Sequence, residues 1–198
     1  MKKLVSLITK ILIMNKTSLI YPIIIFLLIF LLSLNEVSLA QDQPQIPNFR
    51  IRNLSGELFD SRKHQGKPLV LSFFFIRCPP CRKEMPALYK FMSQEGLLEE
   101  LLFVDSYVKA LKIEDEPDTE RKIRNFIDSI NIPPERVYFD EIGTLLKKMS
   151  QSGAFPKAKR IGTLVVYPTI IVINGSGKLV LSLEGTGPGF LEKIRKVL

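Results

Sequence analysis

Three stretches of the chain combine high apolar content with the length of a strand. Leu69–Ile76 is a nearly continuous apolar run, rich in aromatic and branched residues. Leu101–Asp105 is a second run, and Leu164–Ile173 is a third, interrupted by Pro168. The first run is typical of a strand that is buried on both faces, and such strands occur in parallel or mixed sheets covered by helices. The pattern therefore predicts a layered α/β domain.

Apolar residues at helical spacing follow or separate these strands. In the first helical segment, Met85, Leu88 and Met92 would lie on one face, and Pro86 would kink the helix. The predicted helices are Arg82–Gln94, Thr119–Ile130, Ile142–Met149 and Pro188–Val197. The order predicts a mixed central sheet with helices on both faces.

Shorter elements complete this prediction. Phe49–Leu54 and Val137–Phe139 are expected to be short strands, and Asn174–Gly177 a hairpin turn that leads into the strand Lys178–Leu183. Two segments are expected to be loops, one acidic and one a basic surface loop, namely Glu114–Asp118 and Gln151–Arg160.

The first forty residues form a separate segment. Four lysines precede an uncharged run over residues 17–35, and Ser38 and Ala40 are the small residues of a signal-peptidase site. This pattern predicts a signal peptide over residues 1–40 and an exported domain over 41–198, in the periplasm or at the outer face of the cytoplasmic membrane. An uncleaved membrane anchor is the alternative. The apolar stretch Leu19–Leu34 would span about 24 Å as a helix, less than the roughly 30 Å of a bilayer core, which favours cleavage. Translation from Met14 would give a leader of ordinary length.

Composition and charge exclude several classes of protein. The chain has 198 residues, 46% of them apolar, which is enough for one folded core. Its two cysteines exclude a disulfide-stapled scaffold, and together with the single histidine, His64, they supply too few ligands for a structural zinc site. The net charge of +8 falls to +5 without the leader. Apart from Lys157–Arg160 this charge is scattered, without the basic and aromatic face of a nucleic-acid binder.

The two cysteines lie two residues apart, directly after the first buried strand. Cys78 would lie at the N-terminus of the following helix and Cys81 one turn inside it, with Pro79 and Pro80 in the first turn, where proline is tolerated. Helix N-termini carry partial positive charge, and Arg77 adds a cation. We therefore expect Cys78 to ionise more readily than a free thiol, whose pKa is about 8.5, and to be the nucleophile. Cys81 would be the resolving cysteine.

Three other uses of the same thiols remain as alternatives. A structural disulfide would close a very short loop, which constrains the unfolded chain little. A Cu(I)-binding metallochaperone could bind its ion through both thiols, although it would be expected to bring a Met or His nearby. A peroxidase acting through one thiol would need a hydroxyl a few residues before it, and residues 74–77 offer none.

The segment Cys78–Leu88 resembles the active-site helix of the TlpA/ResA-like branch of the thioredoxin superfamily, a group of extracytoplasmic thiol–disulfide oxidoreductases. The resemblance extends back through Gly66–Leu71 and returns at Tyr167–Lys178, which is similar to the cis-proline strand and hairpin of that family. It implies a thioredoxin-like fold in which Pro168 is cis and faces the cysteine pair. It also implies that the Tyr167 backbone contributes to substrate binding, by pairing with an extended segment beside Cys78. Arg77, which departs from the family, is expected to contribute to substrate binding as part of the partner surface.

The sequence departs from this family at two positions near the cysteines. Arg77 replaces a tryptophan, which predicts a change in thiolate stability and in the partner surface. Ser72 replaces the buried acid of thioredoxins proper, so water or a more distant group must accept the proton of Cys81. Glu84 is the nearest acid on the helix, and we expect it to cap the helix or face solvent.

The resemblance implies a reaction and a set of partners. The Cys78–Cys81 disulfide would be the only redox group, with no cofactor and no metal. The substrates would be cysteine-containing proteins, and a membrane electron donor or acceptor would restore the enzyme, with the reductase direction favoured. Nucleic acid is not expected as a partner.

Overall fold

The computed structural model describes residues 43–106, 119–140, 142–163, 165–185 and 187–198. The expected signal peptide over residues 1–40 and the acidic loop Glu114–Asp118 lie outside these residues, so both stay predictions. Among the helices that are described, none is long and apolar enough to cross a bilayer.

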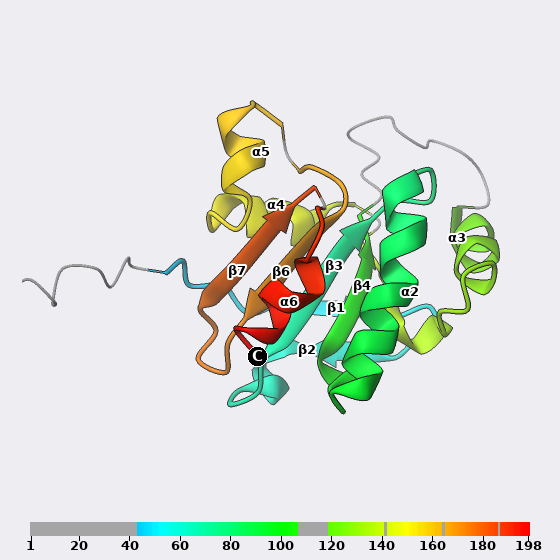
Figure 1. The fold of residues 1–198 in the computed structure, drawn as a ribbon, viewed down its shortest axis with the longest axis horizontal. Coiled ribbons are helices and arrows are strands. Elements are labelled where there is room, and N and C mark those ends of the chain that lie inside the picture. Colours follow the sequence, from blue (N-terminus) through cyan, green and yellow to red (C-terminus); the bar gives the residue numbers. More distant parts are fainter. Residues whose placement is uncertain (1–42, 107–118, 141, 164, 186) are drawn as a thin grey trace, which may run out of the picture. The chain divides into compact units, whose positions relative to one another are not determined.

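A five-stranded mixed sheet forms the centre of the domain (Figure 1). Its spatial order is β5-β4-β3-β6-β7, in which β5, β4 and β3 are parallel and β6 and β7 continue antiparallel. The strands are β3 (Leu69–Phe74), β4 (Leu101–Asp105), β5 (Val137–Phe139), β6 (Thr169–Ile173) and β7 (Leu179–Glu184). Every residue of β3 is buried, as its continuous apolar run predicted. The expected α/β fold with a mixed sheet is therefore confirmed.

Helices cover both faces of this sheet (Figure 1). One face packs against α2 (Pro79–Gln94), α3 (Thr119–Asp128) and α6 (Phe190–Arg195). The other packs against α4 (Thr144–Gln151) and α5 (Pro156–Arg160). Side chains of β3 alternate between the two cores, because successive residues of a strand point to opposite faces. Phe74 belongs to the α2 core, and Phe73 belongs to the α4–α5 core.

A small antiparallel ribbon lies on the α4–α5 core. It consists of β1 (Arg50–Arg52) and β2 (Leu58–Asp60). The first of these strands was predicted from the sequence, but the second was not. Only Phe59 of β2 is buried, and three residues are too few to show a recognisable alternation. Short 3-10 helices are η2 (Ser61–His64), η3 (Leu98–Glu100) and η5 (Pro134–Arg136).

The expected basic loop over Gln151–Arg160 is wrong. The helix α4 extends to Gln151, and Pro156–Arg160 forms α5. The backbone N–H groups of Lys157 and Ala158 donate to the Glu184 carboxylate, each over 2.6 Å. Phe155 is 1% exposed and packs edge-on against Phe73, with 5.4 Å between ring centroids. The five-residue helix was missed because it is too short to show periodicity, and the acid that caps it comes from a distant strand.

The expected strand over Leu164–Ile173 is also shorter than predicted. It begins only at Thr169, which is the last residue that pairs with β3, opposite Phe73. Pro168 has no N–H to donate, so a ladder cannot continue through it. The residues before it form part of the connection from α5.

The packing of Phe155 predicts that the segment 151–163 contributes to stability. Phe155→Ala removes a buried ring, and such changes cost about 3–5 kcal/mol of unfolding free energy. Urea denaturation of the purified protein measures this loss. Ile161→Ala is the control, because Ile161 is 57% exposed and its truncation should change little. A loss below about 1 kcal/mol for Phe155→Ala, far under the usual cost of such a cavity, would contradict the packed segment described here.

Candidate active site

The cysteine pair lies where β3 ends and α2 begins. Cys78 has extended backbone angles, φ −95° and ψ 100°, and is the N-cap of α2, with Pro79 and Pro80 in the first two helical positions. Its N–H donates to the Phe75 carbonyl over 3.1 Å, which closes the turn between strand and helix. Proline fits at these positions because its missing N–H would have no intrahelical partner. The predicted placement of both cysteines is therefore what the structure has.

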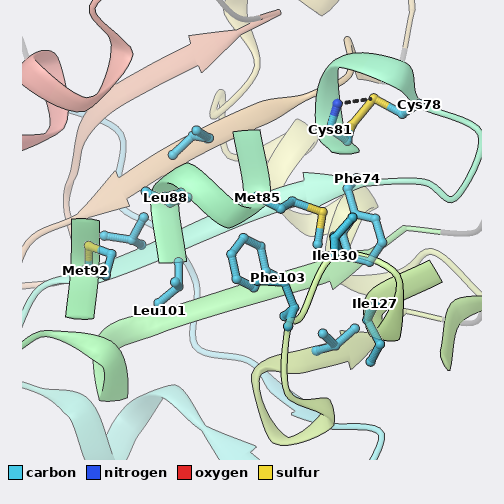
Figure 2. Close-up of a cluster of buried hydrophobic side chains, with 14 of the residues drawn as sticks. Phe74, Cys78, Cys81, Met85, Leu88, Met92, Leu101, Phe103, Ile127 and Ile130 are labelled. Atoms are coloured by element: carbon cyan, nitrogen blue, oxygen red, sulfur yellow. Dashed lines mark hydrogen bonds between the residues drawn. A yellow bond between two sulfur atoms is a disulfide. The ribbon is translucent and has the colours of Figure 1, made fainter. Parts of the chain in front are cut away.

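Cys78 and Cys81 are joined in a disulfide, with their Cα atoms 5.3 Å apart. Figure 2 shows the pair at the N-terminal end of α2, next to the apolar cluster that contains Phe74 and Met85. The backbone N–H of Cys81 donates to Cys78 Sγ over 3.2 Å. After reduction, the same N–H and the positive end of the helix would stabilise a thiolate on Cys78.

Both cysteines are buried, which is unexpected for a reactive pair at the N-terminus of a helix. Cys78 is 3% exposed and Cys81 is fully buried, whereas Arg77, Pro79 and Pro80 are exposed. The first turn of α2 contains no acidic residue that would oppose a negative charge on sulfur. Access to Cys78 is therefore narrow in the disulfide form, and the exposed groups around it are the ones a partner would meet first.

Pro168 lies at the same end of the sheet. The Tyr167–Pro168 peptide bond is cis, and Pro168 is buried directly before β6. Because Thr169 pairs with Phe73, the proline lies beside the end of β3 that leads to Cys78. The Gly185 N–H donates to the Pro168 carbonyl over 2.8 Å and ties it to the end of β7. The cis bond that the resemblance implied is present, and its catalytic role remains a proposal.

The Tyr167 ring spans the ends of three strands. It packs against Phe75 with 4.9 Å between ring centroids. Its hydroxyl donates to the Ser106 carbonyl over 3.1 Å and lies 2.7 Å from Ser106 Oγ. Because the phenol donates its proton to the Ser106 carbonyl, the Ser106 hydroxyl is the donor in the shorter bond to the Tyr167 oxygen. Tyr167 thus connects the start of β6 to the end of β4 across Phe75, the residue that accepts the Cys78 N–H.

Ser106 was not singled out by sequence analysis. It is 3% exposed, and its N–H donates to the Phe74 carbonyl over 3.2 Å. A serine that follows a strand belongs to no motif, and its tyrosine partner is distant in the sequence. The one available signal was that a buried apolar run is followed by two polar residues, Asp105 and Ser106. They lie at the carboxyl end of the parallel strands, where the cysteines were expected.

Two carboxylates occupy the α2 side of the sheet. Asp105 is fully buried and lies opposite Phe74, so strand alternation points it toward the α2 face. Glu84 on α2 is half-buried. Glu84 was expected to cap the helix or to face solvent, and the structure shields one of its two carboxylate oxygens from solvent. Ser72 is buried in β3, so the position of the thioredoxin acid holds no carboxylate.

Arg82, one position beyond Cys81, contacts Phe126 and Ser129. Its guanidinium lies over the Phe126 ring, 4.9 Å from the centroid, and donates to Ser129 Oγ over 2.8 Å. These contacts hold the first turn of α2 against α3. Arg77, immediately before the cysteines, is exposed.

A metal site needs several ligand side chains close together. In the parts of the chain that the structure describes, no three His, Cys, Asp or Glu side chains are grouped so that they could hold an ion. A two-thiolate Cu(I) site would need no third ligand of this kind, so the Cu(I) alternative stays a prediction.

The fold and the cysteine site together define a protein of the thioredoxin superfamily. Residues 43–182 match the model of the AhpC/TSA family. The chain therefore belongs to the AhpC/TSA family, as a TlpA/ResA-like member of the thioredoxin superfamily.

Two relatives support this placement. Thioredoxin-like protein YneN of Bacillus subtilis (strain 168) is 32% identical over 100 residues, which are 50% of this chain and 54% of YneN. Thiol-disulfide oxidoreductase ResA of Bacillus thuringiensis subsp. konkukian (strain 97-27) is 25% identical over 144 residues, 71% of this chain and 68% of ResA. The match thus spans about half the length of YneN and about two thirds of ResA.

Solved structures share the fold. One is a putative protein disulfide isomerase from Bacteroides thetaiotaomicron, with a TM-score of 0.59 and 19% identity over 78% of this chain and 86% of that one. Another is a thiol:disulfide interchange protein of the thioredoxin family from Chlorobium tepidum TLS, with a TM-score of 0.58 and 22% identity over 78% and 95% of the two chains.

The position of Cys78 predicts a difference in reactivity between the two thiols. After reduction, iodoacetamide at mildly acidic pH should label Cys78 ahead of Cys81, because the helix N-terminus stabilises the Cys78 thiolate and Cys81 is fully buried. Peptide mapping by mass spectrometry identifies the labelled residue. Preferential labelling of Cys81 would reverse the assignment of the nucleophile.

The Tyr167–Ser106 contact gives a second prediction. Tyr167→Phe removes both hydrogen bonds and leaves Ser106 buried without its phenol partner, at a cost of about 1 kcal/mol of unfolding free energy. The KM for a disulfide-bonded peptide should rise more than kcat falls, since the ring positions the strand beside the cysteines. Tyr89→Phe is the matched control, because Tyr89 is a half-buried tyrosine of α2. Equal effects of the two variants would argue against a positioning role for Tyr167.

Proposed function

We propose that this protein is an exported thiol–disulfide oxidoreductase that exchanges disulfides with cysteine-containing proteins. The observation that carries the proposal is the Cys78–Cys81 disulfide at the N-terminus of α2. The cis Tyr167–Pro168 bond, directly before β6, lies at the same end of the sheet. The name of ResA, a thiol-disulfide oxidoreductase, supports the same activity.

The reaction uses the two sulfurs in turn. In the reducing direction, the Cys78 thiolate attacks one sulfur of a substrate disulfide, and the other substrate sulfur leaves as a thiolate. Cys81 then loses its proton and attacks Cys78 Sγ, which releases the second substrate thiolate and forms the Cys78–Cys81 disulfide. Two electrons pass from the enzyme to the substrate. The oxidising direction is the reverse of these steps and uses the same atoms.

The surrounding residues have distinct roles in this scheme. The Cys81 N–H stabilises the departing or attacking Cys78 sulfur, because it already donates to that atom over 3.2 Å. Asp105 and Glu84 supply carboxylates on the α2 side, where the Cys81 proton is released. Pro168 and Tyr167 border the approach to Cys78, and the exposed Arg77 meets the partner beside it.

A substrate would bind as an extended segment at the start of β6. Backbone pairing of this kind gives affinity without a requirement for one sequence, which suits an enzyme with several protein substrates. The peptide containing the substrate cysteine would lie along the residues before Pro168. A membrane electron donor would reduce the resulting Cys78–Cys81 disulfide in the next half-reaction.

The location is proposed from the leader and from the chemistry. Residues 1–40 have the order of a signal peptide, with a cationic start, an apolar centre and small residues before the cleavage site. A thiol–disulfide enzyme is needed where cysteines of exported proteins become oxidised. We therefore place the protein in the periplasm or at the outer face of the cytoplasmic membrane, anchored there if the leader is retained.

Trapping with Cys81→Ala tests the function. Without the resolving cysteine, the mixed disulfide between Cys78 and the substrate should accumulate as a band that disappears under reducing conditions. Cys78→Ala should give no such band, although it retains the other thiol. Mass spectrometry of the adducts identifies the partners. Adducts formed equally by both variants would remove the proposed roles, and stoichiometric Cu(I) binding without disulfide exchange would favour the metallochaperone.

A further inference from the structure

We infer that α5 and the turn after it form a docking surface for an acidic stretch of the protein substrate, close to its reacting cysteine. This inference rests on the proposed function and adds a chemical preference for the substrate. The docking surface consists of Lys159, Arg160 and Ile161.

The docking surface is carried by a fixed segment of the structure. The Glu184 carboxylate accepts the N–H groups of Lys157 and Ala158 and so holds the first turn of α5. Ser182 Oγ donates to the Ala154 carbonyl over 2.7 Å, which ties the preceding turn to β7. The Ala158 side chain is fully buried beneath the helix. A segment held in this way presents its exposed side chains in a defined position.

The exposed side chains of the docking surface are cationic and have no acidic partner. Lys159 and Arg160 are exposed and form no ion pair with the residues that the structure describes. The segment 151–163 contains no Asp or Glu. The neighbouring Lys157 is committed, because its Nζ donates to the Glu184 carbonyl over 3.1 Å. Ile161 adds an apolar side chain that is 57% exposed.

The helix α5 lies at the end of the sheet where α2 begins (Figure 1). Glu184, which binds α5, pairs with Thr169, and Thr169 pairs with Phe73 on the strand that leads to Cys78. Neighbouring strands are about 4.8 Å apart, so α5 is anchored about 10 Å across the sheet from β3. Pro168 lies between them and is bound to the residue after Glu184.

This spacing sets the position of the acidic residues in the substrate. An extended chain advances about 3.3 Å per residue. The two strand spacings between β3 and the anchor of α5 correspond to about three extended residues, so a substrate with its cysteine at Cys78 would reach the docking surface no sooner than about three residues from that cysteine. Carboxylates beyond that point would meet Lys159 and Arg160.

A protein substrate fits this location better than a membrane does. One exposed isoleucine is a small apolar contribution for membrane insertion, whereas it suits the mixed polar and apolar rim of a protein interface.

Charge reversal with paired substrates tests the inference. The variant Lys159→Glu/Arg160→Glu is compared with Lys90→Glu/Lys193→Glu, which makes the same charge change at exposed lysines of α2 and α6. Two disulfide-bonded peptides differ only in having two Glu or two Gln residues four positions from the cysteine. At low salt the unaltered protein should have about three- to tenfold higher kcat/KM for the Glu peptide, and added salt should reduce this ratio.

The expected outcome is specific to the docking surface. Lys159→Glu/Arg160→Glu should lose or invert the preference while turning over the Gln peptide normally, and the control pair should keep the preference. Normal turnover without any preference in the unaltered protein would overturn the inference and leave the proposed function standing. No turnover of either peptide by the unaltered protein would instead contradict the proposed function. Binding to phosphatidylglycerol vesicles that depends on Lys159 and Arg160, with no peptide preference, would assign the surface to the membrane and overturn the substrate inference.

Discussion

The arrangement of the site depends on the hydrogen bond from the Cys81 N–H to Cys78 Sγ. The N-terminal turn of a helix has backbone donors without intrahelical partners, and side-chain oxygens of Ser, Thr, Asp or Asn usually accept from them. In this protein the acceptor is the sulfur that also forms the disulfide. The contact that begins α2 is therefore the contact that would stabilise the thiolate. The turn that ends β3, closed by the hydrogen bond from the Cys78 N–H to the Phe75 carbonyl, keeps this sulfur at the carboxyl end of the central strand.

Two effects of opposite sign act on the same sulfur. The N-terminus of α2 and the neighbouring Arg77 favour a negative charge, whereas burial in an apolar cluster disfavours it. The disulfide is uncharged, so burial suits the oxidised form and helix polarity suits the reduced form. The balance between them sets how readily the pair is reduced. The exposed Arg77, directly before Cys78, adds a positive charge on the side that favours the thiolate.

The parts of the fold that could be predicted are those with a local signal. The continuous apolar run of β3, the cysteine spacing after it and the Asn174–Gly177 turn each identify an element from neighbouring residues alone. The missed features depend on partners far apart in the sequence. Ser106 acquires its role from Tyr167, and α5 acquires its cap from Glu184. Neither partner can be identified before the strands are placed side by side.

The cis-proline end of β6 is bound on both of its sides by contacts of this long-range kind. On one side, Tyr167 reaches across Phe75 to Ser106 at the end of β4. On the other, Pro168 accepts from the residue after Glu184, whose carboxylate holds α5. The start of β6 therefore connects the residues beside the cysteines, Phe75 and Ser106, to α5. Because both contacts converge on two consecutive residues, Tyr167 and Pro168 are fixed relative to the end of β4 and to the anchor of α5 together.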